Sequence, residues 1–318
     1  MALEKLAPEG FSIGVELPLD NDWSRDGLNR RMVDNRLPGQ PNMTNHSQLI
    51  KLVDDLGFRV AWLRDIPLYD PRFGDAAQVF EAFTYLGFLA SHTKDILLGT
   101  AAIVLPLREP WLVRKAYNTM QSLSNNRFIL GVASGDRPIE YPVFDRNFGN
   151  RGKDFREAID IITGKKDLSK LQANDLQILP KADTAKMIVA GLAQQSPQYI
   201  GEHLHGWLAY PGSPEDHKKR VKQYREVASK EKPYISFIHL DFKVNEDDAP
   251  IVRHHFGIST GKNGLIEELK AMKDAGVNHI GLHFRRNEDN LEESIKKIGL
   301  EILPLFHKKE TRLDSMFF

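Results

Sequence analysis

Three segments of this sequence combine small residues with groups that can bind an anion. The first is ASGDRP (133–138), in which Ser134 and Gly135 directly precede Asp136 and Arg137. A loop of small residues can bring its backbone N–H groups close to a phosphate or a planar ring. The same residues also fit a tight turn that carries a surface Asp–Arg pair. The loop sequence is compatible with both interpretations.

The other two segments begin helices. In GLAQQSPQYIGEH (191–203), Ser196 is suited to cap a helix and Pro197 to occupy its first position. Free N–H groups at a helix N-terminus attract anions, although ordinary capping explains this segment when it is taken alone. In NRGKDFREAIDII (150–162), Arg151 stands at the helix start, where a basic residue is unfavourable against the helix dipole. Either solvent or an anion beside this arginine would offset that penalty, and this slightly favours a phosphate ligand over a purely structural role.

The stretch LLGTAAIVLP (97–106) begins as a β-strand but then loses side-chain volume. Gly99, Thr100, Ala101 and Ala102 follow one another where a strand in a core would carry large β-branched residues. Either a bound ligand fills the volume that these residues leave, or they allow a helix or loop to approach closely.

Several other chemistries are excluded or disfavoured. The sequence has no cysteine, so disulfides, thiolate nucleophiles and cysteine-based zinc sites are absent. GISTGKNG (257–264) departs from the phosphate-loop pattern, and we expect a plain loop before a helix that starts at residue 265. The pairs His203/His205 and His254/His255 have no carboxylate at the spacing of a catalytic metal site, so we expect no metal.

Composition narrows the class of protein further. The chain has 318 residues, with 43 Lys plus Arg and 43 Asp plus Glu, so neither nucleic acid nor a membrane surface is an expected partner. No apolar run reaches the length of a membrane span, and the start MALEKLAPEG lacks the pattern of a signal peptide. Together with the absence of cysteines, these features lead us to expect a cytoplasmic location. No linker divides the chain, so we expect one domain over residues 1–318.

The elements that must position these segments alternate along the chain. Helical periodicity is clearest at residues 46–57 and 265–276, each of which ends at a glycine. The expected strands are 11–17, 59–63, 95–105, 127–133, 186–191, 206–211, 234–242 and 278–284. Eight strands that alternate with helices predict a (β/α)8 TIM barrel, with a doubly wound sheet as the alternative. The polar stretch 163–183 fits neither element, and we expect an exposed insertion between strands 4 and 5.

A (β/α)8 barrel carries its active site at the C-terminal ends of the strands. This rule places four segments on one rim: 100–102, 134–137, 191–196 and 210–211. The small residues of the third strand would therefore face the functional opening of the barrel.

Together these segments resemble a known family. GTAAIVLP, followed by NRFILGVASGD, VFDRNFGNR and IVAG, is similar to the bacterial luciferase-like, flavin-dependent monooxygenases. The resemblance extends from Phe11 to His283, and LGTAAIVLPLREP is its most specific part. RDIPLYDPRFGD, VASGDRPIEYP and QQSPQYIGEHLHGW are similar to a subgroup of luciferase-type oxidoreductases of unknown substrate.

This resemblance implies FMN on the barrel rim, and a reaction between reduced FMN, O2 and a small organic substrate. It also implies a partner flavin reductase and a homodimer. By position, Ala101 and Ala102 match a pair whose non-proline cis peptide bulges against the flavin ring, and Arg151 matches an arginine that binds the flavin phosphate. The expected cofactor-binding residues are Ala101, Ala102, Ser134, Gly135, Asp136, Arg151, Gly191, Leu192, Gln195 and Ser196.

Two departures limit what the resemblance implies. Ile66 and Pro67 stand where true luciferases carry a histidine pair, so we expect no light emission. Ser134 replaces a second phosphate-binding arginine. The catalytic residues are therefore unassigned, and the candidates near the opening are Asp65, Tyr69, Asp136, Arg137, His239 and His283.

Three alternatives remain open at this point. The first is a deazaflavin-dependent dehydrogenase on the same fold, which would transfer hydride without oxygen. The second is a flavin-binding protein without turnover, which the missing histidine pair makes conceivable. The third is a barrel without flavin, such as a lyase or hydrolase.

Overall fold

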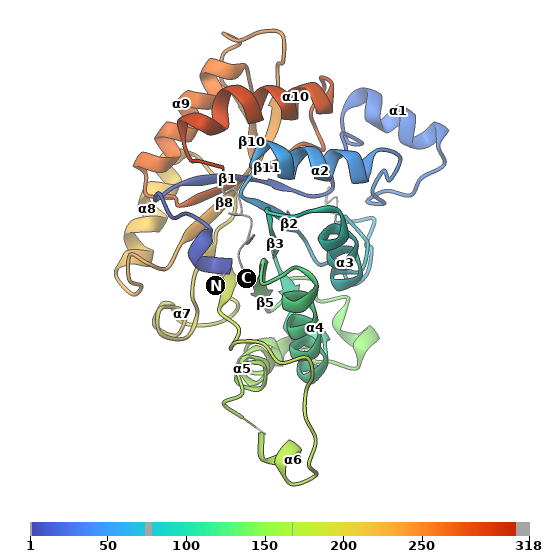
Figure 1. Cartoon of the computed structure of the whole chain (residues 1–318), viewed down its shortest axis with the longest axis vertical. Helices are drawn as coiled ribbons and strands as arrows, with labels where there is room; N and C mark the ends of the chain where they lie inside the picture. The colour runs from blue at the N-terminus through green and yellow to red at the C-terminus, as the bar shows by residue number, and fades with distance from the viewer. Residues whose placement is uncertain (1, 74–77, 167, 310–318) are drawn as a thin grey trace, which may run out of the picture.

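Eight parallel strands close into a barrel (Figure 1). The computed structural model describes residues 2–73, 78–166 and 168–309. In barrel order the strands are β1 (Ser12–Glu16), β2 (Val60–Leu63), β3 (Leu97–Thr100), β5 (Phe128–Ala133), β6 (Met187–Ala190), β7 (Trp207–Leu208), β8 (Tyr234–Phe242) and β11 (His279–His283). The last strand pairs with both β8 and β1 and so closes the barrel. The (β/α)8 prediction is confirmed, and the doubly wound alternative is wrong.

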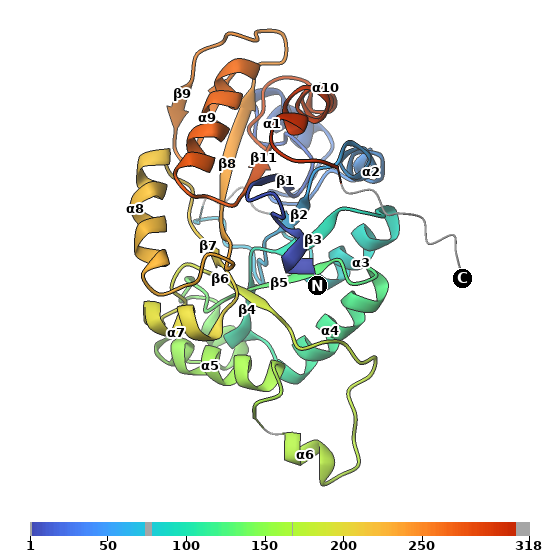
Figure 2. The ribbon, with the colours of Figure 1, turned by 60° about the vertical axis from the view of Figure 1, so that its left-hand side comes forward.

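Helices surround the strands on the outside (Figures 1 and 2). They are α1 (Arg25–Val33), α2 (His46–Leu56), α3 (Ala82–His92), α4 (Pro110–Leu123), α5 (Arg151–Ile162), α6 (Leu168–Gln172), α7 (Pro197–His203), α8 (Pro214–Arg225), α9 (Lys262–Asp274) and α10 (Leu291–Lys297). Short helical turns are η1 (Ala2–Lys5), η2 (Leu105–Leu107), η3 (Tyr141–Phe144), η4 (Phe148–Asn150), η5 (Ile298–Ile302) and η6 (Leu303–Leu305). None of the described helices combines the length and the apolar character that crossing a membrane would require.

The two helices with the clearest periodicity form as expected. In α2, Ile50 and Val53 are buried, and Gly57 ends the helix with a positive φ of 88°. The second helix, α9, begins at Lys262 rather than at residue 265.

The segment before α9 differs from the expectation of a plain loop. Residues Gly257–Thr260 form β10, which pairs in parallel with β8 and antiparallel with β9 (Val252–His254). The physical reason is the unequal length of two barrel strands, because β8 has nine residues and β7 only two. The far half of β8 needs another partner, and its His239 N–H donates to the Phe256 carbonyl at 3.1 Å.

Two aromatic rings fill the barrel interior, and each lies over a glycine of the neighbouring strand. Trp62 is directly opposite Gly99, and a Cβ on Gly99 would lie 2.3 Å from the Trp62 ring. Phe237 is opposite Gly281, where a Cβ would lie 2.6 Å from the Phe237 ring. Of the two alternatives for this stretch, a bound ligand in the volume beside Gly99 is therefore wrong, because the Trp62 ring already takes that space.

The expected strand 95–105 is interrupted in the middle. It forms β3 up to Thr100 and resumes as β4 (Ile103–Val104), which pairs with β5. The peptide between Ala101 and Ala102 is cis, which confirms that prediction. Thr100 does not face a ligand, since its hydroxyl donates to the Gly131 carbonyl at 2.8 Å.

The polar insertion leaves the barrel between β5 and β6, which are its fourth and fifth strands. Its described part, residues 163–166 and 168–183, contains the short helix α6 and projects away from the barrel (Figure 2). Most of the side chains described there are exposed, as expected.

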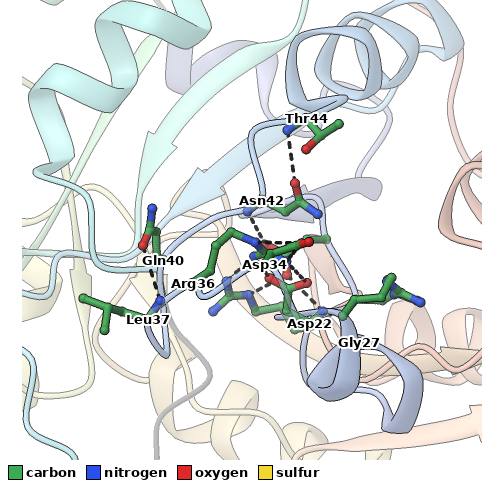
Figure 3. A network of polar contacts seen from close by, with 12 residues as sticks. Asp22, Gly27, Asp34, Arg36, Leu37, Gln40, Asn42 and Thr44 are labelled. Carbon is green, nitrogen blue, oxygen red and sulfur yellow. Dashed lines mark hydrogen bonds and ion pairs between the residues drawn. The ribbon is translucent and has the colours of Figure 1, made fainter. Parts of the chain in front are cut away.

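A polar network fixes the long loop after β1 (Figure 3). Arg36 forms an ion pair with the buried carboxylate of Asp22 and a longer one with Asp34, at 3.3 Å. The Asn42 N–H donates to Asp20 at 3.2 Å. These contacts hold the segment that carries Trp23 over the C-terminal end of the barrel.

The approach of β3 to β5 gives a stability prediction. A Cβ on Gly131 would lie 1.9 Å from the Thr100 carbonyl oxygen, a backbone atom that cannot yield easily. We expect Gly131→Ala to lower the free energy of unfolding by about 1–3 kcal/mol, as overpacking does. Gly87 in α3 has open space around it, so Gly87→Ala should be neutral or stabilising by up to about 1 kcal/mol. Urea unfolding measures both, and equal effects would contradict the close approach.

Candidate active site

A cavity of about 930 Å³ opens at the C-terminal ends of the strands. This volume is within the range of small-molecule and cofactor sites. The cavity is the place where the four rim segments meet, as the barrel fold predicts. Its lining includes Ala101, Ala102, Ser134, Gly135, Asp136, Arg137, Gly191, Leu192, Tyr210 and Pro211.

One wall of the cavity is built from residues with almost no side chain. Ala101 and Ala102 follow β3, Ala133 ends β5, and Ala190 ends β6 immediately before Gly191. Methyl groups on neighbouring strands make a shallow apolar surface against which a planar ring can lie. We refer to these four alanines as the alanine wall.

Asp65 positions the alanine wall. Its side chain, 2% exposed, accepts from the Val104 N–H at 3.1 Å and from Arg108 at 3.1 and 2.7 Å. These three hydrogen bonds engage both oxygens of the carboxylate. Of the catalytic candidates, Asp65 is therefore a group that fixes the chain after Ala102.

The loop after β6 offers backbone N–H groups to the cavity. Gly191, Ala193 and Gln194 have positive φ values of 57°, 47° and 60°. Among the described residues, the N–H groups of Leu192, Ala193 and Gln194 have no hydrogen-bond acceptor. All four residues line the cavity. Successive unpaired N–H groups in a tight turn form an anion-binding concavity, so this loop can hold a phosphate.

Gln195 joins this loop to α5. Its side-chain amide donates to the Gly152 carbonyl at 2.8 Å and to the Ala193 carbonyl at 2.9 Å. Ser196 accepts from the Tyr199 N–H at 3.2 Å and caps α7, as its sequence position predicts. Neither residue lines the cavity itself, and both side chains support the loop that does.

Arg151 lies beside the same loop, next to Gly152. Its guanidinium stacks on the Phe148 ring at 3.7 Å and donates to the Phe148 carbonyl at 2.8 Å. The buried Nε atom of Arg151 has no partner among the residues that the structure describes. Arg151 does not line the cavity in this conformation. Its neighbour in the chain, Gly152, accepts the hydrogen bond from Gln195 of the loop.

The loop after β5 forms the other side of the opening. Ser134 accepts a hydrogen bond from the Tyr141 hydroxyl through its carbonyl, and burial raises the pKa of Tyr141 to about 12. Asp136 is exposed and accepts from the Tyr210 hydroxyl at 3.4 Å. Arg137 stacks over the Phe73 ring at 3.9 Å. Tyr69, another catalytic candidate, is exposed and does not line the cavity.

The opposite wall carries a row of polar side chains from three adjacent strands. Glu16 on β1 is opposite His283 on β11, which is opposite His239 on β8. All three are buried, and the rings of the two histidines stack with centroids 4.3 Å apart. Arg64, which follows β2, forms an ion pair with Glu16 and lies 3.5 Å from His239 Nε2. His239 and Arg64 line the cavity, whereas His283 lies behind His239.

The sequence points to both histidines as candidates but not to Glu16 or Arg64. A signal was present, because Glu16 stands inside the apolar strand FSIGVEL and acids are rarely buried without a partner. Arg64 could not be chosen as that partner from sequence, since 48 residues separate the two.

Burial keeps both histidines uncharged. Desolvation and the nearby Arg64 charge lower the pKa of His239 to about 3. Burial, together with His239, lowers the pKa of His283 far below its usual range. At neutral pH both rings are therefore neutral, which also allows them to stack without repulsion.

The ligand atoms of Glu16, His239 and His283 lie within 4.8 Å of one another, a spacing that could suit a metal ion. The guanidinium of Arg64 already neutralises Glu16 and would repel a cation placed there. The two histidine rings also stack face to face, with planes 27° apart, which is unlike two ligands that point at one ion. These features disfavour a metal, and the absence of a metal site stays a prediction.

Comparison with known proteins fits this architecture. The sequence profile of a family described as luciferase-like monooxygenase matches residues 29–283. The chain belongs to this family. This match confirms the family resemblance predicted from the sequence. Members of the luciferase-like family are oxidoreductases.

Individual relatives are distant. An uncharacterized protein of Mycobacterium tuberculosis is 29% identical over 228 residues, which cover 67% of this chain and 70% of the relative. An F420-dependent secondary alcohol dehydrogenase with an F420–acetone adduct has a TM-score of 0.66 at 16% identity, covering 94% of this chain and 99% of that chain. The oxygenating constituent of 3,6-diketocamphane monooxygenase of Pseudomonas putida, with FMN, has a TM-score of 0.65 at 13% identity, covering 92% and 98%. At these identities the structural likeness concerns the fold.

The neutral state of His239 makes stability depend on pH. Its pKa is about 3 in the folded chain and about 6.5 when unfolded, so below pH 6.5 the unfolded state binds the extra proton. This contribution is fully present above pH 6.5 and is lost as the pH falls, by up to about 1.4 kcal/mol per pH unit. We expect His239→Gln to make the fall in unfolding free energy between pH 6.5 and 5 less steep.

Urea unfolding at several pH values measures this slope. His203→Gln, at an exposed histidine, is the matched control and should keep the parental slope. An unchanged slope in His239→Gln would show that His239 titrates in the folded chain as it does in the unfolded one.

Proposed function

We propose that this protein is an FMN-dependent oxidoreductase, and specifically the monooxygenase component of a two-component system. The observation that carries the proposal is one continuous surface, on which the unpaired N–H groups of residues 192–194 adjoin the alanine wall. FMN has a planar ring and a terminal phosphate, and this surface has a complementary part for each. Family membership supports the same conclusion.

In this proposal each part of the chain has a physical role. Bound FMN supplies the redox chemistry, and the protein binds it, orients it and excludes water. The alanine wall supports one face of the ring, while the phosphate is held by the loop 191–196 and by Arg151. A separate reductase would deliver reduced FMN, and O2 and a small organic substrate would enter the remaining volume. The proposal treats residues 1–318 as one domain of a cytoplasmic homodimer.

Oxygen uptake separates this function from the main alternative. The fold is shared with an F420-dependent dehydrogenase as well as with an FMN-containing monooxygenase, so hydride transfer by a deazaflavin is the competing reaction. Substrate-dependent O2 consumption with reduced FMN supports the monooxygenase. Turnover with reduced deazaflavin that consumes no O2 would overturn it, and binding of neither flavin would overturn the whole assignment.

The phosphate assignment predicts selectivity between flavins. We expect FMN to bind at least about tenfold more tightly than riboflavin, because charge-assisted contacts to a phosphate are worth roughly 1.5–3 kcal/mol. Arg151→Ala should weaken FMN binding and leave riboflavin binding unchanged. Quenching of flavin fluorescence measures both affinities. Equal affinities for the two flavins, or normal FMN binding by Arg151→Ala, would contradict the assignment.

The alanine wall predicts a steric effect on cofactor binding. Ala102 is 8% exposed and faces the cavity, so the phenyl group of Ala102→Phe must occupy the place proposed for the ring. We expect this variant to fold but to bind FMN at least about tenfold more weakly, in proportion to the lost ring contact. Ala173→Phe adds the same group to an exposed position and is the control. Parental FMN affinity in a folded Ala102→Phe would place the ring elsewhere.

A further inference from the structure

The end of the cavity opposite the phosphate loop presents a hydrogen-bond donor beside an acceptor. The donor is the guanidinium of Arg64, and its terminal nitrogen lies 3.5 Å from His239 Nε2. Both side chains line the cavity, and both are held from behind, Arg64 by Glu16 and His239 by the stacked ring of His283.

The direction of this contact fixes the proton on the imidazole. A guanidinium can only donate, so His239 Nε2 accepts and the proton of the neutral ring sits on Nδ1. A separation of 3.5 Å is the long limit of a hydrogen bond, so little is lost when a ligand group replaces it. A hydroxyl placed there would donate to Nε2 and accept from Arg64.

The charges at this end are mixed, because Arg286 lines the cavity together with Asp241 and Glu288. Arg64 is neutralised by Glu16, which is 1% exposed and cannot leave the ion pair for solvent. A carboxylate ligand would meet the Glu16 charge and find no proton donor on His239 Nε2. A neutral group that both donates and accepts satisfies Arg64 and His239 together.

The surroundings of this pair are aromatic. Phe237 is two residues before His239 on β8 and therefore faces the same side of the strand. Phe256 lies edge-on to His239, with ring centroids 5.9 Å apart, and Trp23 completes this side of the cavity lining. These side chains suit an apolar ring next to the polar contact.

We propose that Arg64 and His239 bind the hydroxyl group of a neutral, ring-containing substrate, with the hydroxyl donating to His239 Nε2 and accepting from Arg64. The inference deepens the proposed function and rests on it in one respect, since the ligand is taken to be the substrate of the flavin reaction. The hydroxyl contact determines which edge of the substrate ring points away from the alanine wall.

Two probes that differ only in one hydroxyl test the proposal. 2-Naphthol and naphthalene are titrated into the full chain without FMN at pH 7, and the dissociation constants are obtained from naphthyl fluorescence. We expect 2-naphthol to bind about tenfold more tightly, as two hydrogen bonds of ordinary net strength would provide. 2-Naphthoate, which carries a carboxylate in place of the hydroxyl, should bind no more tightly than 2-naphthol.

Variants locate the preference. His239→Phe keeps a ring against His283 but removes the acceptor, and it should bring the ratio of the two affinities close to one. Glu16→Gln with Arg64→Met removes the donor together with its counter-charge, and it should have the same effect. His203→Phe, at the surface, should keep the parental ratio.

FMN titrations of the same proteins separate this proposal from the proposed function. If FMN binds but the hydroxyl gives no advantage, or if the advantage survives in both variants, the hydroxyl site is wrong and the flavin assignment stands. If the advantage is present and lost in the variants while FMN does not bind, the site is correct and the flavin assignment is wrong. Tighter binding of 2-naphthoate than of 2-naphthol would overturn the preference for a neutral group.

Discussion

The rim of the barrel depends on a chain of buried ion pairs between arginines and carboxylates. Each carboxylate side chain is at most 4% exposed, so removing its arginine would leave an uncompensated buried charge at a cost of about 3–5 kcal/mol. Three of the pairs join segments that follow neighbouring strands, and the fourth, Asp22–Arg36, lies within the loop after β1. The pairs are Asp20–Arg285, Glu16–Arg64, Asp65–Arg108 and Asp22–Arg36. These pairs set the positions of the chain segments that follow β1, β2, β4 and β11.

The ion pairs divide the cavity into two unlike halves. Around β1, β2, β8 and β11 the wall is polar and held by charges, with His239 as its neutral acceptor. Around β3, β5 and β6 the wall has small side chains, and its polar groups are the backbone N–H groups of residues 192–194 together with side chains of the loop after β5, such as Asp136 and Arg137. Asp65 connects the halves, because it binds Arg108 and also the Val104 N–H beyond the alanine wall. A flat cofactor and an oriented substrate need these two kinds of surface, facing each other.

The features that could be predicted from the sequence are those set by residues close together in the chain. The barrel, the capping of α2 by Gly57 and the cap at Ser196 depend on nearby residues, and they were predicted. β10 was not, because its need for a partner arises from the lengths of β7 and β8. The Glu16–Arg64 pair and the filling of the space at Gly99 depend on strand register, which pairs residues far apart in the chain. The family resemblance supplied the cis peptide between Ala101 and Ala102, which periodicity alone does not reveal.

The two aromatic rings that lie over glycines have a consequence for how cavity depth can change. Trp62 over Gly99 and Phe237 over Gly281 meet edge to face at 6.2 Å, in the same packed cluster as Ala102. The floor of the cavity is thus formed by these two side chains, and the backbone of the strands does not set its depth. A larger residue at either glycine is tolerated only if the facing ring becomes smaller. Depth in this barrel is therefore set by the two rings, and a homologue with a smaller side chain in place of either ring would accept a bulkier molecule. A side chain in place of Gly99 or Gly281 would instead require the facing ring to shrink as well.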